Sequence, residues 1–242
     1  MYRDMTGGGI TRSLLLFALP MMAGSLLQQL YNVADTLIVG RALGRDALAA
    51  VGSAFTLTTF LTSVFLGLAM GAGALFAICI GRGDMAALRR AAALALCLIG
   101  AVTAVLTALV YALLSPILRF LQVPETLRGD MAGYLRIIFV GLAATFLYNF
   151  FACLLRAAGN SAAPLWFLGG AALLNVGLDL LFVLVCRWGV AGAAAATVTA
   201  QYAAGLGLTV YALRRCRELL PRRTDFRFDR RILRELLDLS LL

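Results

Sequence analysis

The chain has 242 residues, of which 62% are hydrophobic, and its mean hydropathy is +0.92. A soluble protein of this length could not bury so much apolar surface, since soluble domains are about 45–50% apolar, so the expected environment is a lipid bilayer. The net charge of +9 does not predict a nucleic-acid partner, because the charged residues are confined to gaps between apolar stretches. All 21 basic residues are arginines and histidine is absent, which excludes lysine nucleophiles and histidine metal ligands.

Apolar stretches of about 20 residues recur along the chain, and a helix needs this length to cross about 30 Å of hydrocarbon. The stretches do not alternate with a period of two, so helices are favoured over a β-barrel. The predicted fold is an all-α polytopic membrane protein with a six-helix transmembrane bundle. The six predicted spans are residues 13–39, 53–80, 89–114, 132–154, 164–186 and 190–213.

The chain divides into three predicted parts: a six-span unit at 1–213, a basic loop at 214–231, and the truncated start of a seventh span at 232–242. A cytoplasmic N-terminus would place the basic loop on the cytoplasmic side, where membrane proteins concentrate Lys and Arg. We therefore predict a multi-pass protein with the N-terminus inside. In this topology Arg156 marks the cytoplasmic end of the fourth span.

Two carboxylates lie inside apolar spans, Asp35 in the first and Asp179 in the fifth. A carboxylate at membrane depth costs about 2.5–3.5 kcal/mol on insertion scales and usually faces a cavity or an ion path. Residues three, four and seven positions apart share one face of a helix. By this spacing Gln28 and Asn32 lie on the face of Asp35, and Asn175 lies on the face of Asp179.

The helical rise places these polar groups at similar depths in the bilayer. Asp35 lies about 9 Å before Arg41, and Asp179 about 12 Å before Arg187, at 1.5 Å per residue. Thr197 lies about 13–14 Å into the sixth span from its outer end. We therefore predict one pocket among spans one, five and six, in the outer half of the membrane.

Two carboxylates that lie close together in a dry site cannot both be ionised cheaply, so a proton or Na⁺ is the natural partner. Carboxylate, amide and hydroxyl oxygens are also the hard ligands that small cations prefer. The alternative is that these groups only form hydrogen bonds within the bundle, Thr197 to its own backbone and Tyr134 at the membrane interface. The predicted cation or proton ligands are Asp35, Asn175, Asp179 and Thr197, of which Asp35, Asn175 and Asp179 could bind Na⁺. The possible cavity or supporting residues are Gln28, Asn32 and Tyr134.

Four stretches carry a family resemblance: LPMMAGSLLQQLYNVADTLIVGRALG at 19–44, LLRAAGNSAAPL at 154–165, LLNVGLDLLFV at 173–183 and WGVAGAAAATVTAQ at 188–201. With them the chain resembles the N-terminal half of a MATE (multidrug and toxic compound extrusion) transporter, closest to the DinF-like branch. The resemblance implies twelve spans in two lobes. It also implies an N-lobe cation or proton site, whose acidic and amide positions match Asp35, Asn175 and Asp179.

The function implied by the resemblance is that of a secondary antiporter of the plasma (inner) membrane, not an enzyme. It would export organic, cationic and amphipathic compounds in exchange for H⁺ or Na⁺, with no cofactor besides the coupling ion. The expected partners are the bilayer, a small organic substrate and a C-terminal lobe that this chain, as a fragment of a longer product, would lack. One alternative is a lipid-linked sugar flippase of the same superfamily. Another is an intramembrane aspartyl protease, but its GxGD motif is absent from both acidic positions.

Overall fold

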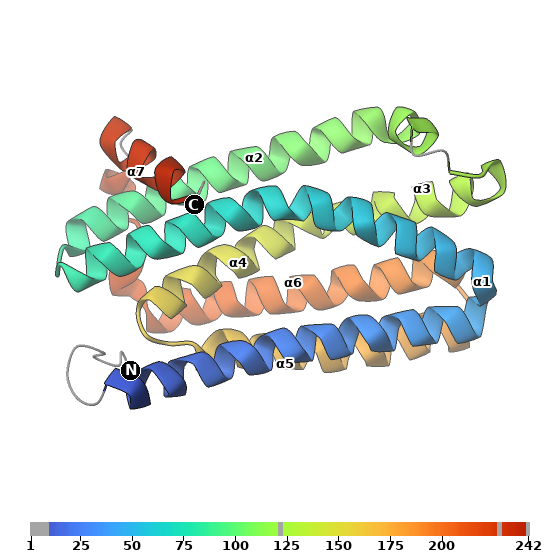
Figure 1. The fold of residues 1–242 in the computed structure, drawn as a ribbon, viewed down its shortest axis with the longest axis horizontal. Helices are drawn as coiled ribbons and strands as arrows, with labels where there is room; N and C mark the ends of the chain where they lie inside the picture. Colours follow the sequence, from blue (N-terminus) through green and yellow to red (C-terminus); the bar gives the residue numbers. More distant parts are fainter. Residues whose placement is uncertain (1–9, 121–122, 227–228, 241–242) are drawn as a thin grey trace.

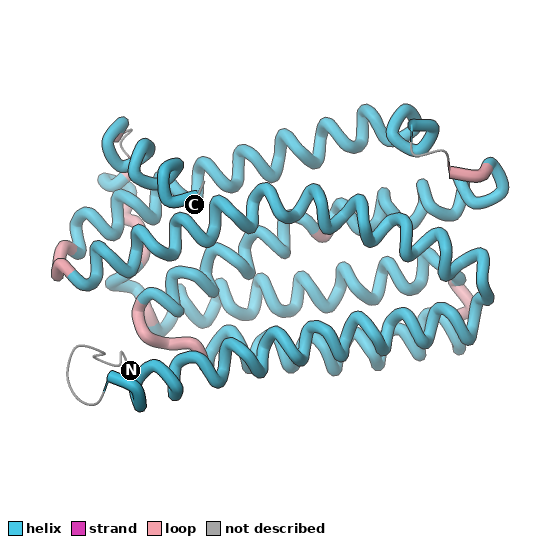
Figure 2. The backbone as a smooth tube through the Cα atoms, viewed as in Figure 1, coloured by secondary structure: helices cyan, strands magenta, loops and turns pink. Residues whose placement is uncertain are grey.

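The computed structural model describes residues 10–120, 123–226 and 229–240, and helices dominate these residues (Figures 1 and 2). The α-helices are α1 (Ile10–Gly81), α2 (Met85–Phe120), α3 (Glu125–Val140), α4 (Leu142–Ala157), α5 (Ala162–Asp179), α6 (Gly189–Arg215) and α7 (Arg230–Ser240). A π-helix, η1 (Leu180–Val185), extends α5, and two short 3₁₀ helices, η2 (Arg217–Leu219) and η3 (Arg223–Asp225), follow α6.

Helix α1 contains the first two predicted spans as two arms that run in opposite directions (Figure 1). Gly44, with φ 88° and ψ −173°, is the non-helical residue between them. This backbone conformation favours glycine, because a Cβ atom would be strained there. The helices therefore extend beyond the predicted span ends at 39 and 53, up to a single reversing residue.

The fourth and fifth predicted spans are each composed of two helical segments. Gly141 separates α3 from α4, and α5 changes to the wider π-helix directly after Asp179. In the π-helix the Cys186 amide donates to the Leu181 carbonyl at 2.8 Å, five residues earlier. Such π segments occur frequently at functional sites.

Four helical segments within the described residues are long and apolar enough to cross a membrane: Ala47–Gly81, Met85–Arg119, Arg128–Ala157 and Ala162–Val185. They correspond to the second to fifth predicted spans, which confirms an all-helical protein with membrane-length apolar helices. The first and sixth predicted spans coincide with the first arm of α1 and with α6. Their membrane crossing, and with it the count of six, stays a prediction.

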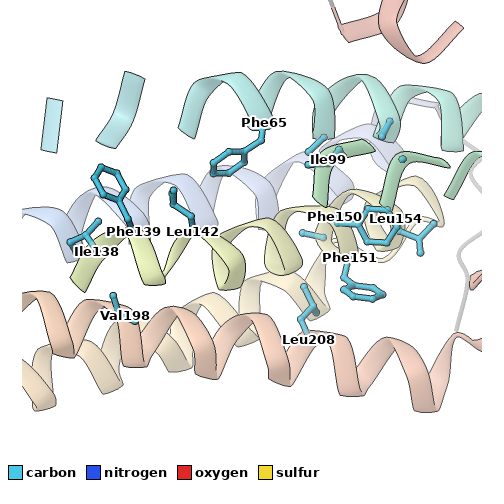
Figure 3. Packing of buried hydrophobic residues seen from close by; sticks show 14 of the residues in the cluster. Phe65, Ile99, Ile138, Phe139, Leu142, Phe150, Phe151, Leu154, Val198 and Leu208 are labelled. Atoms are coloured by element: carbon cyan, nitrogen blue, oxygen red, sulfur yellow. The ribbon is translucent and has the colours of Figure 1, made fainter. Parts of the chain in front are cut away.

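The apolar core lies mainly among the second arm of α1, α2, α3 and α4 (Figure 3). Phe150 of α4 forms edge-to-face pairs with Phe76, at a ring-centroid distance of 6.1 Å, and with Phe151, at 5.1 Å. Such pairs contribute about 0.5–1.5 kcal/mol beyond the burial of their surface. By contrast, Trp166 and Leu173 of α5 are 79% and 78% exposed, as expected for side chains that face lipid.

The connections between helices gather at the two ends of the bundle (Figure 1). The α1–α2 and α4–α5 connections lie at the end where α6 finishes, and α7 packs there against α1 and α2. The turn at Gly44 and the η1–α6 connection lie at the opposite end. Successive connections therefore alternate between the two ends. We call the end that carries the α4–α5 connection the basic end, because Arg82, Arg156 and Arg215 lie there.

Candidate functional site

A cavity of about 550 Å³ lies between both arms of α1 and helices α3 to α6. The helices that form it are those predicted to carry the polar residues, together with α3, α4 and the second arm of α1. Neither α2 nor α7 contributes to its wall. Among the predicted site residues, those that line the cavity are Gln28, Asn32, Asp35, Tyr134, Asn175 and Thr197.

Asp179 lies behind the cavity wall, and Asp35 lies between it and the open space. The Asp179 residue is completely buried, whereas Asp35 is partly exposed to the cavity. The two carboxyl groups lie close enough for each to act electrostatically on the other. No donor from the described residues reaches Asp35 Oδ1 or either carboxyl oxygen of Asp179. Two bare carboxylates repel each other in a desolvated site, and a proton or a cation between them would relieve this repulsion.

Asn175 and Thr197 complete the oxygen cluster. Asn175 lies one helical turn before Asp179 in α5 and is completely buried. Its Nδ2 donates to the Thr197 Oγ1 at 3.5 Å, and this contact joins α5 to α6. The Asn175 Oδ1 then has no donor within the described part of the chain. The cluster therefore offers amide, hydroxyl and carboxylate oxygens, which is the ligand chemistry of Na⁺ or a shared proton.

Tyr134 of α3 separates this cavity from a second one. The second cavity, of about 390 Å³, lies at the end of the bundle that carries the turn at Gly44, and its wall includes Asp130 and Trp188. Tyr134 is 6% exposed and lines both cavities. Its ring therefore forms part of the wall between the large cavity, which holds Asp35, and the second cavity at the Gly44 end of the bundle.

The structure brings the four predicted ligands together in one place, and their role in ion binding stays a prediction. Gln28 and Asn32 line the cavity without joining the cluster, and the Asn32 amide donates to the Gln29 side chain at 3.3 Å. Tyr31 also lines the cavity, and its hydroxyl lies near the Thr197 side chain.

Sequence reasoning missed a further row of polar residues in the cavity, on α4. Thr145, Asn149 and Arg156 all line it, and their spacing of four and seven places them on one helical face. Arg156 is thus more than the predicted marker of a span end, because it contributes to the cavity wall. The spacing of these three residues is visible in the sequence. Arg156 was nevertheless interpreted only as the cytoplasmic end of the fourth span, because an arginine is expected at that position in the predicted topology.

Membrane-length apolar helices that enclose a wide cavity, with a carboxylate pair at its wall, are typical of a membrane transporter. The chain belongs to the MatE family, whose model matches residues 20–181.

The chain is similar to two curated proteins of Bacillus subtilis (strain 168). It is 33% identical to the probable multidrug resistance protein YpnP over 198 residues, which are 82% of this chain and 44% of YpnP. It is 32% identical to the probable multidrug resistance protein YoeA over 234 residues, which are 94% of this chain and 48% of YoeA. The chain thus spans about half the length of these curated relatives.

The fold is similar to solved MATE structures. The crystal structure of a MATE protein in the bent conformation superposes with a TM-score of 0.89 at 26% identity, and the match covers 97% of this chain and 52% of that one. The predicted family is confirmed, and the length of the match is that expected for one half of such a transporter. Family membership also confirms that the chain is an integral membrane protein of a transporter family and not an enzyme, which removes the protease alternative.

Proposed function

We propose that this chain is the ion-coupling lobe of a secondary antiporter that exports amphipathic organic cations in exchange for H⁺ or Na⁺. In this proposal it crosses the plasma membrane six times with a cytoplasmic N-terminus, and a second six-helix lobe supplies the opposite wall of the cavity. The observation that carries the proposal is the pair Asp35 and Asp179, in which Asp35 Oδ1 and both Asp179 carboxyl oxygens are buried with no donor among the described residues. A cation or proton bound between the two carboxylates relieves their repulsion, so the occupied site is more stable than the empty one.

The coupling ion supplies the driving force for export. One charge that crosses a potential of 100 mV releases about 2.3 kcal/mol, enough to bias a two-state equilibrium by more than tenfold. Asp35 borders the substrate cavity and faces Asp179 behind it, so ion occupancy and substrate occupancy act on the same helices. Binding of one can therefore disfavour the other, as alternating access requires.

Efflux from inverted membrane vesicles tests this function when proton and sodium gradients are imposed separately. We expect export of a fluorescent organic cation under one gradient and not under a potassium gradient of the same size. Ion binding by the chain itself is a second readout, because a bound ligand at 100 times its Kd stabilises the folded state by about 2.7 kcal/mol. A melting temperature that responds neither to NaCl, compared with choline chloride, nor to pH would contradict the ion site.

The cation is proposed to reach the carboxylates through the second cavity, past Tyr134. We expect Tyr134→Ala to open this partition and to raise passive H⁺ or Na⁺ flux through the reconstituted protein several-fold, because a water-filled gap replaces the ring. Tyr134→Phe keeps the ring and should keep the flux low. The flux is followed with a pH-sensitive or sodium-sensitive dye inside proteoliposomes. Equal flux in the two variants would exclude Tyr134 as the partition.

A further inference from the structure

The large cavity carries opposite charges at its two ends. Among its described lining residues, those with a formal charge are Asp35 and Arg156. Asp35 lies with the oxygen cluster, and Arg156 lies in the last turn of α4 at the basic end. Ser161 follows Arg156 by five residues in the chain, and Asn175 precedes Asp179 by one helical turn. Ser161 and Asn175 are fourteen residues apart along α5, or about 21 Å. The cavity is therefore long enough for one elongated molecule to contact both ends.

The charge of Arg156 is not neutralised within the described residues. The ion pairs formed there involve Arg89, Arg128, Arg231 and Arg234. Nor does the Arg156 guanidinium donate a hydrogen bond to a described residue, although arginines near helix ends often bind the last carbonyls. Its five donors are thus available to the cavity that it lines.

The neighbouring polar groups add to the positive character of this end. Ser161 is 8% exposed, lines the cavity, and its hydroxyl has no hydrogen-bond partner among the described residues. It directly precedes α5, so the partial positive charge of that helix N-terminus lies beside it. The nearby Tyr148 hydroxyl donates to the Pro164 carbonyl at 3.1 Å, which ties α4 to the start of α5. Arg156 and Ser161 lie on the two segments that this contact joins, and both line the cavity.

We propose that Arg156 and Ser161 form an anion-recognising subsite, so that the preferred ligands of the cavity carry a carboxylate or phosphate group besides their apolar or cationic body. A guanidinium binds such planar or multidentate anions through paired, charge-assisted hydrogen bonds. The apolar body would lie along Leu165 and Leu168 of α5, which line the cavity between its two ends. This inference rests on the proposed export function and specifies the substrate class of the same cavity.

The test uses two rhodamine dyes that differ only in one group: a free carboxylic acid and its ethyl ester. Both dyes share one cationic, amphipathic ring system, and the ionised acid adds a negative charge that the ester lacks. Their binding to the full chain in phosphatidylcholine vesicles is measured by fluorescence anisotropy, without an ion gradient. The variants are Arg156→Gln, Arg156→Lys and, as a matched control, Arg215→Gln, which removes an exposed arginine from the end of α6 outside the cavity wall.

We expect the wild-type chain to bind the acid more tightly than the ester. Arg156→Gln should weaken binding of the acid about 10-fold or more and leave the ester unchanged. Arg156→Lys should retain part of the preference, because it keeps the charge but loses the paired geometry. Arg215→Gln should behave like the wild type.

Four outcomes would overturn the subsite. Equal affinity of the wild type for acid and ester, or an equal loss of both dyes in Arg156→Gln, would show that Arg156 has no role in anion recognition, while cation export would stand. A preference for the acid that disappears when phosphatidylglycerol is added would assign Arg156 to an anionic lipid headgroup instead. Failure of the wild type to bind either dye would contradict the proposed cavity function itself, and the subsite with it.

Discussion

Replacing Asp35 or Asp179 with asparagine is expected to abolish ion-coupled efflux while the protein remains folded. Asparagine keeps the size of the side chain and removes its charge. A unit charge about 4 Å from a cation contributes about 4 kcal/mol at an effective dielectric constant of 20, so the loss of one carboxylate should weaken cation binding about 1000-fold. Efflux under the coupling gradient should then fall to the passive leak of the vesicles.

The stability of the same variants distinguishes a lost ion site from a damaged fold. The Asp179 carboxylate is completely buried and has no donor among the described residues, so removing its charge should leave the melting temperature unchanged or raise it. The stabilisation that Na⁺ or protons give the wild type should disappear. Asp238→Asn is the matched control, because the Asp238 side chain on α7 is exposed and its carboxylate is 4.0 Å from the Arg234 Nε. Wild-type efflux in both site variants would refute the assignment.

Adding one methyl group at Gly205 is expected to destabilise the bundle. Helices α4 and α6 approach closely at this point, and a Cβ atom on Gly205 would lie 2.5 Å from the Ala144 carbonyl oxygen. Because the opposing atom belongs to the backbone of a helix, it cannot rotate away as a side chain would. Overpacking of this kind costs about 1–3 kcal/mol, which for a chain of this size corresponds to a loss of about 2–12 °C in melting temperature.

The matched control for this variant is Gly170→Ala, since a Cβ atom at Gly170 in α5 would have no neighbour within 4 Å. The same substitution there should be neutral or slightly stabilising, because alanine favours the helix by about 1 kcal/mol relative to glycine. Thermal unfolding of the purified protein in detergent, followed by light scattering or circular dichroism, separates the two. Equal melting temperatures for the two variants would show that α4 and α6 can move apart at no cost.

Much of the site could be predicted because two geometric properties of the α-helix apply to it, its repeat and its rise per residue. The helical repeat placed Asn175 on the face of Asp179, and the rise per residue placed Asp35 and Thr197 at a similar depth. The structure brings these four residues together. Neither argument required knowledge of the loops or of the packing partners.

The departures from prediction occur where hydropathy carries no information. All six residues of η1, LLFVLV, are apolar, so an α-helix and a π-helix have the same composition there. Gly141 divides α3 from α4 inside an uninterrupted apolar stretch. Arg156 was assigned to topology alone, because a single sequence cannot show which face of a span end borders a cavity. These features depend on tertiary contacts between helices and not on local composition.

The single-residue reversal at Gly44 has a consequence for how the chain enters the membrane during synthesis. The first arm of α1 carries Asp35, Asn32 and Gln28, so as an isolated segment it would insert weakly. Only one non-helical residue separates the arms, so we expect the first arm to insert into the bilayer together with the second and not well before it. We expect both arms to leave the translocon as a helical hairpin, in which the apolar second arm drives partition into lipid and carries its polar neighbour with it.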